Sequence, residues 1–168
     1  MALDRQTVLT IKDAHFKYRT NFGGSPDKYN KAGGKRYFNV IVPEDIVDKL
    51  IDDGWHVKET HPQDDQAVEH YIKVIVNFNN FNPPKIWVKT PGGEPIRIYE
   101  DLAHELDSYH YLKIDQISIV PWITDKYNFD YPPAYLKSMY ATIEDEDDSP
   151  ADFFGAHPSD DDEEIPFE

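Results

Sequence analysis

The sequence contains no cysteine, and this absence excludes several classes of protein at once. A chain without thiols has no disulfide framework, no thiolate zinc site and no cysteine nucleophile. Long apolar runs are missing too: no segment approaches the roughly 20 residues that cross a bilayer. The N-terminus also lacks the apolar core of a signal peptide. We therefore expect a soluble protein of the cytoplasm.

Basic residues are scarce, and their uneven distribution divides the chain. There are 17 Lys and Arg against 32 Asp and Glu, a net charge of −15. Residues 144–168 hold 12 of the acids and no base, whereas residues 1–42 hold eight bases and only three acids. Such dense like charge, with few apolar groups, opposes folding. The sequence therefore predicts one folded domain over residues 1–143 and a disordered acidic tail over residues 144–168.

Alternating apolar and polar residues predict that the domain is built mainly from strands. The pattern occurs in six segments: 7–18, 36–42, 71–78, 85–89, 114–122 and 134–143. In the segment 85–89, Ile86 and Val88 are expected to face inward, which leaves Trp87 on the opposite, polar face.

Helical patterns are fewer. A helix is predicted over residues 43–54, because acids occupy the first turn, Gly54 follows the last apolar residue, and one stripe is apolar: Ile46, Val47, Leu50 and Ile51. A second short helix is predicted over residues 100–108. The fold class is therefore mainly β with minor α. The pattern favours an OB-fold-like antiparallel barrel with one or two short helices, and a β-sandwich fits nearly as well.

No catalytic motif is complete in this sequence. The serine-hydrolase pattern GxSxG is absent. One cluster has metal-ligand residue types without a recognised spacing, so we expect a solvated loop there: His61, Asp64, Asp65, Glu69 and His70. A nuclease that holds Mg²⁺ with Asp64, Asp65 and Glu69 stays open as an alternative. We expect a protein that is not an enzyme and uses no metal or cofactor.

Basic and aromatic residues are interleaved over residues 15–37, at 85–89 and over 122–140. Single-stranded nucleic acid needs both types, because cations neutralise the phosphates and flat rings stack on bases at about 1–3 kcal/mol per base. The segment 122–140 also contains Tyr131 and Tyr140. The predicted DNA-binding residues are Lys17, Tyr18, Arg19, Phe22, Lys28, Tyr29, Lys31, Lys35, Arg36, Tyr37, Lys85, Trp87, Lys89, Trp122, Lys126, Tyr127, Tyr135 and Lys137.

The end of the acidic tail combines charge with an apolar tip. An apolar tip fills a pocket on a partner while acids meet a basic rim, and proline limits the entropy lost on binding. The run from Asp160 to Glu164 followed by Ile165, Pro166 and Phe167 resembles the C-terminal peptide of bacterial single-stranded DNA-binding proteins, which ends on its Phe, whereas Glu168 follows here. We therefore expect protein partners to bind Asp160, Asp161, Asp162, Glu163, Glu164, Ile165, Pro166 and Phe167.

The domain carries a second resemblance. The segments KYNKAGGKRYFNVIVPEDIVDKLIDDGWHVK and AYLKSMYATIEDE resemble a family of phage proteins described as single-stranded DNA-binding proteins, with similarity over about residues 5–146. The resemblance implies an OB-like domain that binds ssDNA independently of sequence, during phage replication or recombination in the cytoplasm of a bacterial host. The tail would recruit replication or recombination proteins and compete with DNA for the basic N-terminal part.

A different function also accounts for the charge. An acidic protein that mimics DNA and blocks a nucleic-acid-binding host protein would explain the net charge of −15. It explains less well why bases cluster in residues 1–42 and why acids concentrate in the tail. This alternative predicts no ssDNA binding and a tight complex with a basic partner.

Overall fold

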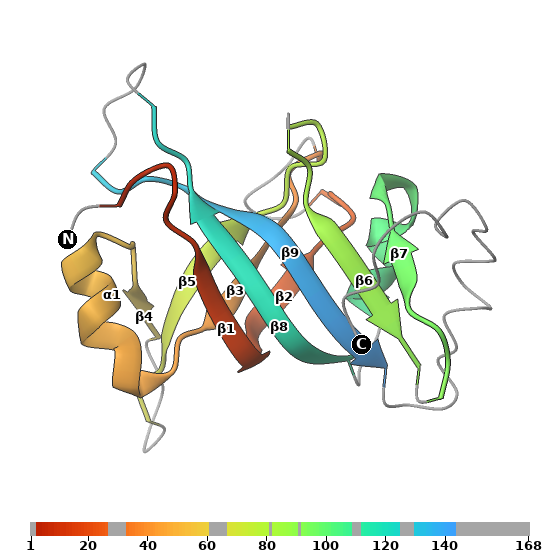
Figure 1. Ribbon diagram of the computed structural model, residues 1–168, viewed down its shortest axis with the longest axis horizontal. Coiled ribbons are helices and arrows are strands. Elements are labelled where there is room, and N and C mark those ends of the chain that lie inside the picture. The colour runs from red at the N-terminus through yellow and green to blue at the C-terminus, as the bar shows by residue number, and fades with distance from the viewer. Residues whose placement is uncertain are drawn as a thin grey trace.

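The computed structural model describes residues 3–26, 33–60, 67–80, 82–90, 92–108, 112–124 and 130–143. These residues build one nine-stranded sheet with short helices at its margins (Figure 1). The strands are β1 (Leu9–Ala14), β2 (Phe16–Asn21), β3 (Tyr37–Ile41), β4 (Lys58–Glu59), β5 (His70–Ile75), β6 (Lys85–Lys89), β7 (Ile96–Ile98), β8 (Leu112–Pro121) and β9 (Ala134–Ile143). The helices are the 3₁₀ helix η1 (Glu44–Ile46), α1 (Val47–Asp53) and the 3₁₀ helix η2 (Glu100–Ser108).

The main path through the sheet runs β1-β8-β9-β5-β3-β2, with β4 added beside β5 and the β6–β7 pair added beside β9. Most ladders are antiparallel, whereas β9 runs parallel to both β5 and β6. Figure 1 shows β1, β8 and β9 crossing in front of β2 and β3. The sheet is therefore strongly curled rather than flat.

The two ends of this path, β1 and β2, are consecutive in the chain and meet at His15. Residues 7–18 were predicted as one strand, but the backbone bends there, with Asp13 at a left-handed φ of 51°. β1 pairs with β8, while β2 pairs with β3. One bent segment thus supplies both the first and the last strand of this path. The two strands meet at His15, but no ladder between them closes the described sheet into a barrel.

The prediction of a mainly β, OB-fold-like domain with short helices is confirmed by this arrangement. An OB-fold is a small, partly open barrel of curled strands. The β-sandwich alternative requires two separate sheets, whereas the strands described here belong to a single one. β4 and β7 are too short to give an alternating pattern, which is why the sequence did not predict them.

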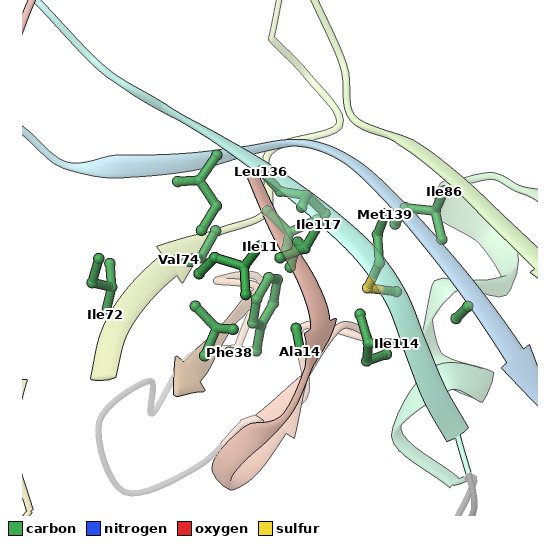
Figure 2. Close-up of a cluster of buried hydrophobic side chains, with 14 of the residues drawn as sticks. Ile11, Ala14, Phe38, Ile72, Val74, Ile86, Ile114, Ile117, Leu136 and Met139 are labelled. Carbon is green, nitrogen blue, oxygen red and sulfur yellow. The ribbon is translucent and has the colours of Figure 1, made fainter. Parts of the chain in front are cut away.

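The core lies inside the curl. Figure 2 shows labelled side chains of β1, β3, β5, β8 and β9 gathered between these strands, with Ile86 of β6 near Met139. Phe38, Val40, Ile72 and Val74 are completely or almost completely buried. Because strand side chains alternate, their sequence neighbours on β3 and β5 must point outward. The core thus determines which side chains form the outer surface.

The helix predicted over residues 43–54 is present as η1 followed by α1. Val47 and Leu50 are buried, whereas Ile51 is 51% exposed, so the predicted apolar stripe is wrong at Ile51. The helix ends at Gly54, whose φ of 109° is left-handed and whose N–H donates to the carbonyls of Leu50 and Ile51. In the described part of the chain, every helix is too short or too polar to cross a bilayer.

Candidate nucleic-acid interface

The outer surface of β2, β3 and β5, which we call the three-strand face, carries aligned polar side chains. The antiparallel register places Lys17 opposite Asn39, and Asn39 opposite Lys73. Directly opposite residues point to the same side of a sheet. Lys73 is exposed, and Lys17 and Asn39 are half-buried. Two ammonium groups and an amide therefore form one row across three strands.

Tyrosines border this row on one side. Ile41 lies opposite Tyr71 in the ladder, and the ring of Tyr71 meets that of Tyr18 edge to face, with 5.4 Å between centroids. Tyr18 is 57% exposed, since its left-handed φ of 63° lies in a register irregularity of β2 and turns the ring outward. Burial raises the pKa of Tyr71, so its hydroxyl stays neutral. An uncharged, accessible ring is a suitable platform for a base.

Further rings border the row on the other side. Tyr37 lies opposite Ile75, and the ammonium of Lys73 lies 4.8 Å from the centroid of the Tyr37 ring. In the parallel ladder, Ile75 pairs with Tyr135 of β9. The Trp122 ring stacks on Tyr135 with 6.0 Å between centroids, and Trp122 is exposed. Aromatic surface thus extends from β3 across β5 to β9.

Carboxylates lie near the start of β5, at the end of the three-strand face where Tyr71 lies. Lys17 Nζ donates to Glu69 at 2.8 Å, and this hydrogen bond raises the pKa of Lys17. His70 lies between two acids, with Nδ1 2.9 Å from Glu44 and Nε2 3.5 Å from Glu59. The hydrogen bond to Glu44 is the main reason that the pKa of His70 is raised. A bound phosphate would therefore compete with Glu69 for Lys17.

Two predicted stacking residues are instead part of the interior. Phe22 is completely buried and stacks on Phe38 with 5.2 Å between centroids. Trp87 is 3% exposed, and the Arg97 guanidinium lies 5.8 Å from its ring. The predicted polar face of β6 was wrong at Trp87, because β7 places a cation against that ring. Neither ring is available to a base in this structure.

The remaining predicted residues are scattered over the molecule. Arg36 donates to the carbonyl of Phe22 and lies 3.5 Å from Glu100, so it holds the β2–β3 connection in place. Lys85 and Lys89 lie on β6, which pairs with β9 further along the same edge as β5. The exposed cations on the described surface include Arg19, Lys35 and Lys137. Outside the described residues lie Lys28, Tyr29, Lys31, Lys126, Tyr127 and the tail residues 160–167.

Sequence reasoning missed Asn39, Tyr71 and Lys73, which complete the three-strand face. The signal was present in the alternation itself. Ile72 and Val74 alternate with Tyr71 and Lys73, so a strand that buries the first two residues turns the other two outward. A single lysine in the mostly apolar segment 71–78 gives no basic and aromatic interleaving, which was the pattern that predicted the other binding residues.

A metal site finds no support in the described part of the chain. No group of three His, Asp or Glu side chains there is placed to hold an ion. Glu69 is engaged by Lys17 and His70 by two carboxylates. The other residues of the proposed nuclease cluster, His61, Asp64 and Asp65, lie outside the described residues.

A curled β-sheet with lysines and tyrosines on one open face is typical of small β-barrel modules that bind oligonucleotides. The chain belongs to the phage ssDNA-binding domain family, whose sequence model matches residues 2–162. This match confirms the resemblance in the sequence. Among solved structures, the chain is similar to a single-stranded DNA-binding protein from bacteriophage Enc34 in complex with ssDNA. The TM-score is 0.50 at 16% identity, and the match covers 83% of this chain and 88% of that one. No curated protein sequence matches.

Proposed function

We propose that the protein binds single-stranded DNA without sequence preference along the three-strand face. The observation that carries the proposal is the row of Lys17, Asn39 and Lys73 between exposed or half-exposed tyrosines. In OB-folds the second and third strands and the loops beside them bind oligonucleotides or oligosaccharides. β3 and β5 take the place of those strands here. Membership of a phage ssDNA-binding family favours the nucleic acid over the sugar.

The chemistry of the face suits a strand of any sequence. Ammonium groups neutralise phosphates, and rings stack on every base because each has a π face. Tyr18 and Trp122 are the most exposed of these rings, at 57% and 37%. They lie on β2 and directly after β8, so a strand that contacts both would cross β3, β5 and β9.

In the phage, we propose that the domain coats displaced strands during replication or recombination. The acidic tail would recruit a partner protein through Ile165, Pro166 and Phe167, and would compete with DNA for the cations of the domain. Removing residues 144–168 leaves every described strand intact, because β9 ends at Ile143. The shortened chain should bind DNA more tightly than the full chain, especially at low salt. Equal or weaker binding would contradict tail competition.

Tryptophan fluorescence tests ssDNA binding directly. The chain has three tryptophans. Trp55 and Trp87 are 2% and 3% exposed, so quenching by oligo-dT must come from Trp122. We expect salt-sensitive quenching with the full chain. Trp122→Phe should abolish the signal yet still bind a labelled oligonucleotide. If neither quenching nor binding occurs, the proposal is wrong and the DNA-mimic alternative should be tested with a basic partner.

A further inference from the structure

A cavity of about 180 Å³ opens beside the three-strand face, where β5 meets the start of β9. Its floor is apolar and includes Ile75, Pro133 and Ala134. The backbone N–H of Trp122 donates to the carbonyl of Pro133 at 2.8 Å, which fixes the segment that enters β9 against the end of β8. The cavity is therefore bounded by hydrogen-bonded backbone on this side.

Two flat rings form one wall. The His56 and Tyr131 rings are parallel within 6° and their centroids are 4.3 Å apart. Both residues are exposed, and Tyr131 is 48% exposed. His56 follows Trp55, which is buried and whose N–H donates to the carbonyl of Leu50. The end of α1 thus sets the position of His56 opposite Tyr131.

Two cations lie at the rim. Lys58 and Lys73 both line the cavity, Lys58 from β4 and Lys73 from β5. No carboxylate is among the described residues that line it. Burial, and secondarily the charge of Lys58, lowers the pKa of His56, so its ring is neutral at neutral pH. The site therefore combines an apolar floor, an uncharged aromatic wall and a cationic rim.

Size and chemistry together restrict the occupant. Pockets for drug-sized ligands measure about 300–1,000 Å³, so this cavity admits a smaller group such as one ring system. An aromatic wall selects a planar ring, and the two ammonium groups select an anion attached to it. A nucleobase with its phosphates outside the cavity meets both requirements. Because Lys73 also belongs to the three-strand face, a strand lying there passes the mouth of the cavity.

We propose that this cavity receives one nucleobase of the bound strand, stacked beside His56 and Tyr131, while Lys58 and Lys73 pair with the flanking phosphates. The proposal rests on the proposed function, and it assigns a base pocket next to an otherwise open surface. A single pocket would set the register in which the strand lies on the face without reading its sequence.

Photocrosslinking of the unaltered full chain tests the proposal. An oligo-dT that carries 5-iodouracil is bound and irradiated, and the adducts are located by peptide mass spectrometry. We expect an adduct on Tyr131 or His56. If the oligonucleotide binds but adducts form only on residues such as Tyr18 or Trp122, the base pocket is wrong while ssDNA binding stands. If adducts at Tyr131 or His56 form with free 5-iodo-dUMP but not with the oligonucleotide, the pocket does not serve the strand and the proposal is also overturned.

Variants add an equilibrium test, read by anisotropy of a labelled oligo-dT. Tyr131→Ala should weaken binding about 5-fold to 150-fold, as expected for the loss of one stacked base. Tyr131→Phe keeps the ring and should bind like the unaltered chain. Tyr99→Ala is the matched control, because Tyr99 is also exposed but lies beside Arg97, outside the cavity. Equal binding by Tyr131→Ala and Tyr99→Ala would overturn the proposal. Failure of the unaltered chain to bind would instead refute the proposed function itself.

Discussion

Lys73→Ala provides the sharpest test of the three-strand face, because this side chain is exposed and lies on β5, at one end of the row that it forms with Asn39 and Lys17. Its ammonium lies 4.8 Å from the centroid of the Tyr37 ring. An exposed contact of this kind contributes about 0.5–1 kcal/mol. The loss of this contact should lower the free energy of unfolding by about that amount, and the fold should be retained.

The effect on binding follows from counterion release. The logarithm of the binding constant falls linearly with the logarithm of salt concentration, and each phosphate neutralised on a single strand makes this slope steeper by about 0.7. Lys73→Ala should lower the slope by about that amount. One such contact raises the affinity about 5-fold at roughly 0.1 M salt relative to 1 M. The dissociation constant of Lys73→Ala should therefore be about 5-fold higher than that of the unaltered chain at roughly 0.1 M salt, and the two constants should converge near 1 M.

The assay is anisotropy of a labelled oligo-dT across a salt series. Lys113→Ala is the matched control, since it removes the same charge from an exposed position on β8, outside the three-strand face. Its slope should stay unchanged. An unchanged slope for Lys73→Ala, or an equal decrease for both variants, would refute the reasoning, because net charge rather than the position of the lysine would then control binding.

Three further perturbations have defined outcomes. Glu69→Gln removes the negative charge that lies 2.8 Å from Lys17 Nζ and should tighten ssDNA binding at low salt in the same anisotropy assay; weaker binding would contradict a role for Lys17. Gly23→Ala would place a Cβ 2.6 Å from the Cβ of His104 and should lower the free energy of unfolding by about 1–3 kcal/mol in urea denaturation. His70 has a raised pKa, so its stabilising effect should be complete below about pH 6.5 and decline as pH rises through the folded-state value. Urea midpoints measured against pH for the unaltered chain and His70→Gln should therefore differ most at low pH, and parallel profiles would contradict this.

The sequence by itself determined the class of the fold and the chemistry of the surface. Alternation at residues 36–42 and 71–78 placed Phe38 and Val74 inside, since a strand with one buried face has a period of two. The same period assigned Tyr37 to the surface. Gly54 marked the end of the helix because a left-handed residue there favours glycine.

Only the tertiary structure decided which of the many rings and cations lie together. Trp87 was predicted to be exposed, but the short strand β7 places Arg97 against it, and three residues give no periodic signal. Lys17 and Lys73 are far apart in the chain and become neighbours of Asn39 through the ladders. The pairing of His56 with Tyr131 likewise depends on where β9 joins β5. Periodicity reports which way a side chain points along its own strand, whereas the residue beside it is set by long-range pairing of strands, which leaves no local pattern in the sequence.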